Sequence, residues 1–347
     1  MDKQKLLVIC GGQSTEHSVS RMSCTSVYRE LDKNKYEITL VGIDQSGQWY
    51  ILSPKQTDLT LPTWLEGSQK VEDLYGLIQS FDVVFPVLHG MYGEDGTIQG
   101  LLELARVPYV GCRVLGSSVS MDKIYTKMIL EQAGIKQVKS AYVKKRYDGT
   151  LVVVDQDFSE HQNVEEIITA KLGYPCFVKA SNSGSSVGCY KVNDRHELMA
   201  KLEEAAQYDR KVVVEEGINC TELECAVLGN DDPSATIVGE ILPAGDFYTF
   251  ESKYEDENSK TRAPACISDE VATYIQETAV KVFKAVDGHG LARVDFFLDK
   301  DSGEVYLNEI NTMPGFTSIS MYPKLWEASG LEYQKLLDRL IELAFER

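Results

Sequence analysis

The sequence is short of basic residues and contains no long apolar run. Its 35 lysines and arginines are outnumbered by 53 aspartates and glutamates, which gives a formal net charge of −18 at pH 7. A surface this acidic repels nucleic acids and anionic membranes, so we expect neither as a partner. Any phosphate ligand must then be held by local donors rather than by the overall charge. No segment approaches the roughly 18 uncharged apolar residues that a membrane-spanning helix needs.

Paired cysteines are also missing. The eight cysteines are scattered, none has the C-x-x-C spacing, and Cys220 and Cys225 are the nearest pair. No histidines accompany them at a zinc-binding spacing, so we expect reduced thiols in a cytoplasmic protein. The apolar run at 6–10 is too short for a signal peptide and ends at a Gly-Gly turn, which predicts a first strand.

Two nucleotide-binding motifs do not occur in recognisable form. No Gly-Lys-Ser or Gly-Lys-Thr is present, which excludes a Walker A loop. The segment GGQSTE at 11–16 follows the first strand but lacks the G-x-G-x-x-G spacing. This argues against a dinucleotide-dependent oxidoreductase.

Length and apolar pattern predict several domains. A chain of 347 residues exceeds what one hydrophobic core usually supports. Short apolar runs alternate with amphipathic stretches in the first third, which is typical of an α/β domain with a parallel sheet. Two α+β units follow. We place the domains at 1–119, 120–211 and 212–347, with a long polar loop at 243–264. Helices are expected at 18–31, 96–105, 117–134, 164–172, 195–206 and 331–345.

The segments LARVDFFLD (291–299) and EVYLNEIN (304–311) predict a β-hairpin. A three-residue turn with Gly303 in the left-handed position pairs Asp295 with Glu309 and Arg293 with Asn311. All four side chains then project from one face, whereas a loop of two or four residues would divide them. The opposite face is core and carries Val294, Phe296, Leu307 and Ile310.

Two readings of this polar face stay open. Two carboxylates and an amide oxygen are hard ligands that suit Mg²⁺, which keeps other positions for water and phosphate. Alternatively, Arg293 neutralises the acids in a purely structural cluster. The Pro-Gly turn and the hydroxyl residues that follow favour a site, because Gly315 brings a backbone N–H close to a ligand and Ser320 can hold a carboxylate.

Three further loops carry candidate residues. A strand ending at Lys179 leads into the small-residue loop 181–188, which can wrap phosphate oxygens or be a flexible turn. Glu16 lies at a helix start, either as a favourable first-turn acid or as a partner for a substrate ammonium. His89 and Glu94 follow a strand, at the edge where parallel sheets bind ligands, and a histidine there is either a ligand contact or structural.

The motifs together resemble the ATP-grasp superfamily, and within it the D-alanine–D-alanine ligases. The resemblance covers essentially the whole chain. It rests on GGQSTEHSVS (11–20), LHGMYGEDGTIQG (88–100), GSSVSMDK (116–123), FVKASNSGSSVG (177–188), FESKY (250–254), RVDFF (293–297) and NEINTMPGFTSIS (308–320).

This resemblance implies an N-terminal Rossmann-like domain followed by an ATP-grasp fold of two α+β domains. It implies an enzyme that uses ATP to join two D-alanine molecules through a D-alanyl phosphate, for peptidoglycan precursor synthesis. It further implies two Mg²⁺ ions, or Mn²⁺ in their place, and a homodimer. The loop 243–264 would be a lid that excludes water from the acyl phosphate.

Site roles are implied for individual residues. Glu16, Ser185 and Tyr254 would link the first substrate's ammonium to the glycine-rich loop, and Arg293 and the Gly315 N–H would stabilise the oxyanion. The first alanine's carboxylate would lie by His89, and the second would meet Ser320 and Met321. Metal ligands would be Asp295, Glu309 and Asn311. ATP would be bound by Lys123, Lys179, Ser186, Glu215, Ile218, Glu222 and Lys253.

Departures and alternatives remain. Ala180 stands where the family often has proline, and Asn182-Ser183 lacks the charged residue common before Gly-Ser-Ser. A sibling ligase for D-serine is one alternative, while FESKY argues against one for D-lactate. A regulatory nucleotide-binding module that has lost catalysis would lack metal ligands or lysines, and all of these are present.

Overall fold

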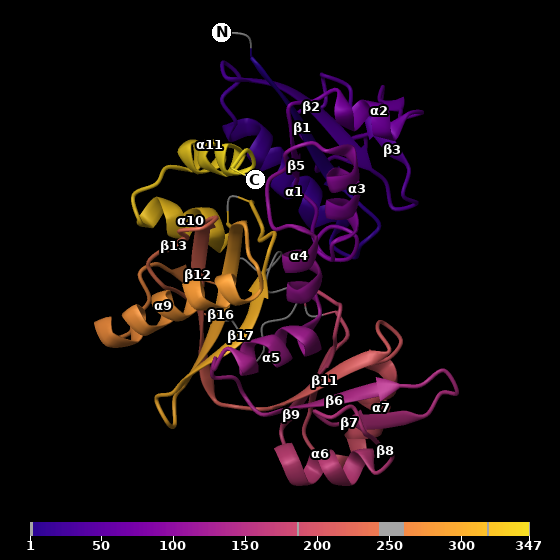
Figure 1. Cartoon of the computed structure of the whole chain (residues 1–347), viewed down its shortest axis with the longest axis vertical. Helices are drawn as coiled ribbons and strands as arrows, with labels where there is room; N and C mark the ends of the chain where they lie inside the picture. Colours follow the sequence, from indigo (N-terminus) through magenta and orange to yellow (C-terminus); the bar gives the residue numbers. More distant parts are fainter. Residues whose placement is uncertain (1–2, 186, 243–259, 318, 347) are drawn as a thin grey trace.

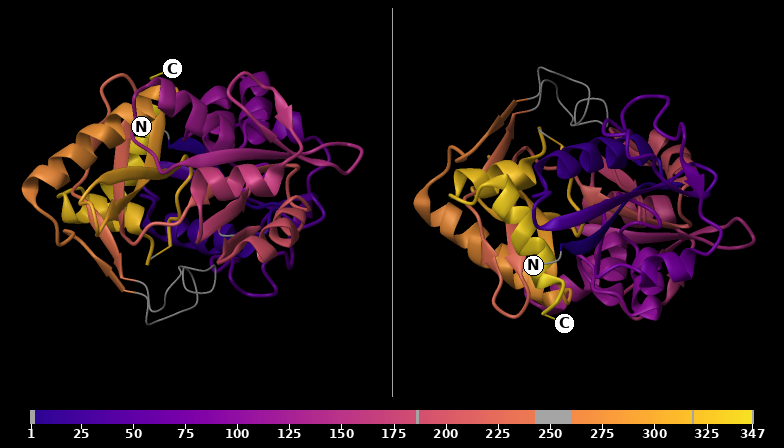
Figure 2. Two further views of the ribbon diagram at one scale, coloured as in Figure 1. Left: turned by 90° about the horizontal axis from the view of Figure 1, so that it is seen from below. Right: turned by 90° about the horizontal axis from the view of Figure 1, so that it is seen from above.

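The computed structural model describes residues 3–185, 187–242, 260–317 and 319–346 (Figure 1). Within this part of the chain there are three β-sheets, one in each successive third of the sequence. Helices pack on the sheets, and helix α9 (Asp269–Ala285) lies on the outer side of the third sheet (Figures 1 and 2). The α/β and α+β organisation expected from the sequence is therefore present.

The first sheet has the order β4-β3-β2-β1-β5. Strand β1 is parallel to β2 and β5, as the alternation of apolar runs and helices predicts. The outer strands β3 and β4 are antiparallel additions that were not expected. The strands are β1 Gln4–Gly11, β2 Tyr36–Ile43, β3 Trp49–Ile51, β4 Gln69–Lys70 and β5 Val83–Pro86, and the helices are α1 His17–Glu30, α2 Leu74–Gln79 and α3 Thr97–Ala105.

The single helix expected over 117–134 is wrong, because two helices meet there. Helix α4 spans Val114–Met121 and α5 spans Lys123–Gln132. Asp122 between them has extended backbone, and its carboxylate accepts the N–H groups of Ile124 (3.1 Å) and Tyr125 (3.3 Å). Aspartate thus caps a new helix instead of continuing the old one, which places Lys123 at the first position of α5.

The second sheet is antiparallel, with the order β10-β9-β11-β6-β7-β8. Its own core packs against α6 and α7. Strand β11 pairs with β6 and β9, so a boundary after Glu216 would keep this sheet whole; the domain limits stay predictions. The elements are β6 Ser140–Lys145, β7 Leu151–Val154, β8 Glu160–His161, α6 Val164–Leu172, β9 Cys176–Ala180, β10 Cys189–Val192, α7 Arg195–Ala205 and β11 Lys211–Glu216.

The third sheet is antiparallel, with the order β15-β14-β12-β16-β17, and β13 pairs with β12. One core between α9 and this sheet contains Val294, Phe296, Leu307 and Ile310, the face that the sequence predicts to be buried. The elements are β12 Cys220–Gly229, β13 Ser234–Ala235, β14 Gly239–Leu242, β15 Lys260–Arg262, α9 Asp269–Ala285, β16 Gly290–Asp299, β17 Val305–Asn311, α10 Met321–Ala328 and α11 Tyr333–Leu343.

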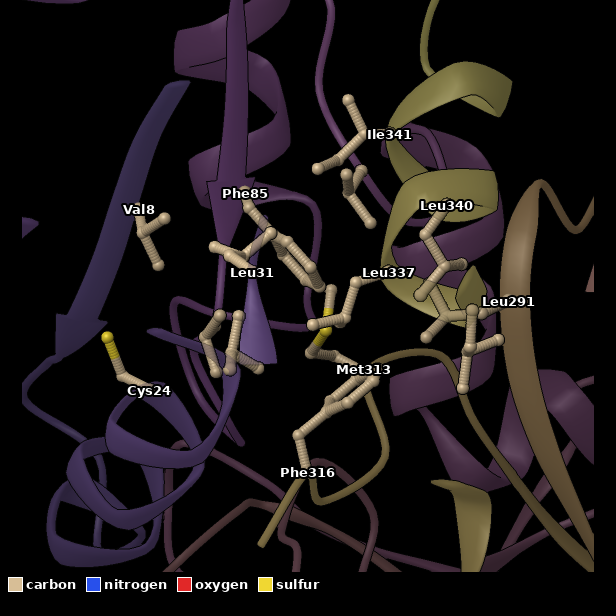
Figure 3. Packing of buried hydrophobic residues seen from close by; sticks show 14 of the residues in the cluster. Val8, Cys24, Leu31, Phe85, Leu291, Met313, Phe316, Leu337, Leu340 and Ile341 are labelled. Atoms are coloured by element: carbon tan, nitrogen blue, oxygen red, sulfur yellow. The ribbon is translucent and has the colours of Figure 1, made fainter. Parts of the chain in front are cut away.

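The first and third sheets share one hydrophobic core. Figure 3 shows side chains of the first sheet and α1 facing those of α11, with Met313 and Phe316 between them. The Phe316 ring lies 5.8 Å from that of Phe85 and 5.6 Å from that of Tyr322. Residues from both ends of the chain therefore hold the same aromatic side chain.

Two expectations about chemistry and membranes can be compared with this fold. All eight cysteines lie in the described part of the chain and are free thiols, as expected. Across the described ranges, no helix has both the length and the apolar character that crossing a bilayer requires.

Because Phe316 is fully buried between the two sheets, its loss should weaken the whole molecule. We expect Phe316→Ala to lower the free energy of unfolding by about 3–5 kcal/mol. Phe345→Ala is a matched control, because that ring is 44% exposed, and it should change the same quantity by less than about 1 kcal/mol. Urea unfolding of both variants measures the difference, and equal effects would contradict a shared core.

Candidate active site

A cleft, partly open to solvent, lies where the three sheets meet. It is lined by fourteen of the fifteen described residues that the sequence assigns to the site. The exception is Ile218, which lies between β11 and β12 outside the lining. Ser186, Lys253 and Tyr254, and most of the loop expected to be a lid, fall outside the described residues. The fourteen are Glu16, His89, Lys123, Lys179, Ser185, Glu215, Glu222, Arg293, Asp295, Glu309, Asn311, Gly315, Ser320 and Met321.

The hairpin β16–β17 forms the predicted pairs, but with a longer turn and a β-bulge. Arg293 faces Asn311 and Asp295 faces Glu309, as expected. The turn has four residues rather than three, since Asp299 N–H bonds Glu304 (2.9 Å) and Leu298 pairs with Val305. A register shift at Asn308 compensates for the extra residue.

This bulge separates the two faces of the hairpin. Leu307 pairs with Phe296 and is buried in the core, whereas Asn308 and Glu309 both line the cleft. Strict alternation along the strand would have put Leu307 and Glu309 on the same face. The bulge therefore allows the core and the cleft to be supplied by residues only two positions apart.

Arg293 lies between two acids on the cleft side of the third sheet. Its guanidinium donates to both oxygens of Asp295, each at 2.7 Å, and its Nε lies 3.3 Å from Glu224 Oε2. Burial alone would lower the pKa of Arg293, but Asp295 and Glu224 outweigh it and hold that pKa well above the usual value. Glu224 was not predicted, although strand alternation along β12 places it on the same face as Glu222.

The hairpin side chains fit a divalent cation of the oxygen-preferring kind. Asn311 donates its amide N–H to Asp295 (3.0 Å), which gives its oxygen the ligand role. Asp295 already binds Arg293, yet a carboxylate has about four lone-pair sites. The described residues include no group of three or more His, Cys, Asp or Glu side chains that could hold a metal, so this set is limited to two carboxylates and one amide. Two carboxylates, one amide, water and substrate phosphate are a set that Mg²⁺ accepts.

Glu215 is shared by two lysines where the second sheet borders the cleft. Its carboxylate lies 2.5 Å from Lys179 Nζ and 2.6 Å from Lys127 Nζ. Burial would raise the pKa of Glu215, but the two ammonium groups outweigh it and lower the pKa to about 2. Burial alone would lower the pKa of Lys179, but the carboxylate of Glu215 outweighs it and raises that pKa. Lys127 was missed; it lies four residues after Lys123, one turn along the same face of α5.

Glu16 joins the first sheet's side of the cleft to the glycine-rich loop. Ser185 Oγ donates to Glu16 Oε1, and Lys123 Nζ donates to the Ser183 carbonyl (2.6 Å). A Cβ atom at Gly90 or Gly184 would lie 2.4 or 2.6 Å from Glu16 Oε2. Glycine at both positions leaves the space that this carboxylate occupies.

His89 and Ser320 lie near the segment that follows β17. The ring nitrogens of His89 lie 2.9 Å from the Met313 carbonyl and 2.9 Å from Ser23 Oγ. Burial lowers the pKa of His89, so its imidazole is neutral at pH 7. Ser320 precedes α10, and its Oγ accepts the Thr317 N–H (3.0 Å). Helix N-termini of this kind favour carboxylates.

The fold and the cleft define an ATP-grasp protein. Models of the D-Ala–D-Ala ligase N-terminus and C-terminus match residues 5–112 and 129–342. The chain is 50% identical to the D-alanine–D-alanine ligase of Clostridium acetobutylicum, over 99% of both chains. It therefore belongs to the D-alanine–D-alanine ligase family.

Solved structures of two relatives have the same fold. The D-alanine–D-alanine ligase of Coxiella burnetii is 38% identical with a TM-score of 0.86, over 100% of this chain and 95% of that one. The VanG D-Ala:D-Ser ligase of Enterococcus faecalis is also 38% identical with a TM-score of 0.86, over 99% and 100%.

Replacing Glu215 with glutamine would leave two buried ammonium groups without their shared anion. We expect Glu215→Gln to lower the free energy of unfolding at pH 7 by about 3 kcal/mol. Because the folded-state pKa is about 2 and the ordinary value is 4.5, this stabilisation is complete above pH 4.5 and is lost as the pH falls toward 2. The difference between wild type and variant should therefore narrow on acidification.

Urea unfolding at pH 7 and pH 3.5 measures that narrowing. Glu304→Gln is the control, because Glu304 pairs with Lys136 on an exposed hairpin end and should matter by less than about 1 kcal/mol. If the difference in unfolding free energy between wild type and Glu215→Gln is the same at both pH values, the charge of Glu215 does not stabilise the two lysines.

Proposed function

We infer that the chain is an ATP-dependent D-alanine–D-alanine ligase that makes D-alanyl-D-alanine for peptidoglycan precursors. The observation that carries this function is the convergence of the family's motif residues, from all three sheets, on one cleft. Full-length similarity to D-alanine–D-alanine ligases supports the same substrate.

In the first step, the carboxylate of one D-alanine attacks the γ-phosphate of ATP and gives D-alanyl phosphate and ADP. Lys123 and Lys179 hold the phosphates, and Lys127 adds a third cation beside Glu215. Asp295, Glu309 and Asn311 would hold two Mg²⁺ ions, or Mn²⁺, which neutralise phosphate charge. Glu215 reads adenine, with Ile218 nearby, and Glu222 binds ribose. Ser186 and Lys253 complete the nucleotide contacts.

In the second step, the free amine of the other D-alanine attacks the acyl phosphate, and inorganic phosphate leaves. Arg293 and the Gly315 N–H stabilise the tetrahedral oxyanion, a task for which preorganised donors are effective. Glu16 and Ser185, already hydrogen-bonded to each other, and Tyr254 hold the first substrate's ammonium. His89 lies by its carboxylate, and Ser320 and Met321 receive that of the second alanine.

Two points of cellular setting belong to the proposal. The eight free thiols support a reducing compartment, and we place the protein in the cytoplasm.

We also propose a homodimer that buries an apolar patch on α2, α3 and α4. The patch consists of Tyr75, Leu104 and Leu115, which are 45%, 73% and 59% exposed, and the Tyr75 hydroxyl donates to the Leu104 carbonyl (2.8 Å). Exposed clusters of this kind mark association surfaces.

The activity predicts release of ADP and phosphate when ATP, Mg²⁺ and D-alanine are present, and none with L-alanine. We expect Glu309→Gln to lower kcat by about a hundredfold or more, because it removes a charged metal ligand. Coupled ADP assays and product chromatography measure both, with D-serine and D-lactate tested as second substrates.

Glu304→Gln again serves as the matched control, since it lies on the same hairpin outside the cleft and should retain wild-type kcat. Circular dichroism checks that both variants keep the fold. Wild-type turnover by Glu309→Gln would refute its metal role, and faster product formation with D-serine than with D-alanine would identify the sibling ligase.

The dimer proposal predicts that a charge in the apolar patch separates the subunits. We expect Leu104→Glu to be a monomer in light scattering after gel filtration, while the wild type has twice the mass of one chain. Leu61→Glu is the control, because Leu61 is 49% exposed but lies outside the patch. A monomeric wild type, or a dimeric Leu104→Glu, would reject this interface.

A further inference from the structure

The residues Thr312–Phe316, here termed the 312–316 loop, follow β17 and carry the backbone N–H proposed for the oxyanion. This loop belongs to the last third of the chain, but it is held by side chains from the first third. Two separate sets of hydrogen bonds reach it, one through Ser23 and one through Glu94.

Ser23 connects the loop to His89. The Phe316 N–H donates to Ser23 Oγ (3.1 Å), and Ser23 Oγ lies 2.9 Å from His89 Nε2. His89 Nδ1 lies 2.9 Å from the Met313 carbonyl. That carbonyl only accepts, so Nδ1 carries the proton, Nε2 accepts, and the Ser23 hydroxyl donates to it. The loop is thus bonded at Met313 and at Phe316 by one continuous chain of donors and acceptors.

Glu94 supplies the second connection. Its Oε1 accepts the Met313 N–H (3.0 Å), and its Oε2 accepts the Gly90 N–H (2.7 Å). Met313 therefore has both its N–H and its C=O held from the first third of the chain. Pro314 follows with a restricted φ angle. Bonds at Met313 and Phe316, on both sides of Gly315, fix the direction of its peptide N–H.

Burying the polar side chains of Ser23 and Glu94 is an unfavourable way to stabilise the fold. Ser23 is fully buried, next to the core that contains Met313 and Phe316. Burial and the nearby Glu16 raise the pKa of Glu94 to about 8, because both disfavour a charged carboxylate there. Apolar residues of similar size would stabilise such a junction at least as well. Polar groups kept at a cost in a cleft point to a role in its chemistry.

We propose that Ser23 and Glu94 are positioning residues for the ligation step, which hold the 312–316 loop so that the Gly315 N–H faces the reacting carbonyl. The inference rests on the proposed function and adds to it two residues that never touch the substrate's reacting atoms. It predicts a selective defect, because phosphoryl transfer to D-alanine forms no tetrahedral carbon, whereas attack by the amine does.

Ser23→Ala and Glu94→Gln test this proposal in the full-length enzyme. Each should lower kcat for dipeptide formation by about tenfold, since a displacement of about 1 Å can cost up to a hundredfold. The Michaelis constant for ATP should stay within twofold of wild type. The ratio of ADP released to dipeptide formed should rise above one, because the stranded acyl phosphate hydrolyses.

Thr25→Val is the matched control. Thr25 lies on the same helix, is buried, and has a hydroxyl that bonds the Arg21 carbonyl (2.9 Å) and the Leu59 N–H (3.0 Å), away from the loop. It should lose stability while its ratio of ADP to dipeptide stays at one. A ratio of one in Ser23→Ala or in Glu94→Gln, whatever its total rate, overturns the proposal for that residue.

The wild-type assay separates this inference from the function beneath it. If the wild type releases no ADP with D-alanine, the proposed function fails. If it is active and both variants keep a ratio of one, only the positioning role fails. If Ser23→Ala does not fold, Glu94→Gln still tests the positioning role, because glutamine is close in shape to glutamate.

Discussion

The cleft depends on a balance between carboxylates and a smaller number of cations. Among the described residues, seven acids line it (Glu16, Glu94, Glu215, Glu222, Glu224, Asp295 and Glu309), against four cations (Lys123, Lys127, Lys179 and Arg293). Arg293 and Lys179 are each held in place by a close acid partner. Glu94, with its pKa raised to about 8, is largely protonated at pH 7, but the other acids still outnumber the cations, so this described part of the lining repels phosphates. Nucleotide phosphates therefore need compensating charge here, which supports the proposal that Asp295, Glu309 and Asn311 hold divalent cations on the same wall.

Geometry in the cleft comes from contacts between parts of the chain that are far apart in sequence. The hairpin supplies the acids and Arg293, and its bulge lets core and cleft draw on neighbouring residues. The first third supplies Glu16, which reaches the glycine-rich loop, and Ser23, which reaches the loop after the hairpin. Asn182, just before the Gly-Ser-Ser segment, bonds Asp209 (2.6 Å) and Asp122 (3.3 Å) and so fastens the base of the glycine-rich loop. Rigid attachment at several points suits a site whose two reactions need different donors.

Local patterns were enough to predict much of this arrangement. Strand alternation and a turn glycine predicted that Asp295 faces Glu309, although the turn is one residue longer and a bulge restores the pairing. The break at Asp122 and the helix Asp269–Ala285 were missed, yet both carry capping signals, Asp122 itself and Ser268. The bonds from Ser23 and Glu94 were beyond reach, because nothing near either residue indicates a partner more than 200 positions away. Periodicity reports which face is buried, but not what covers it.

The core shared by the two ends of the chain has a consequence for biosynthesis. Leu336, Leu337 and Leu340 of α11 cover apolar side chains of β1, α1 and β5, which leave the ribosome about three hundred residues earlier. At common translation rates that interval lasts roughly 15 to 60 s. Throughout it α1 covers only part of this apolar surface, so the first sheet completes its core only when the last helix has been made.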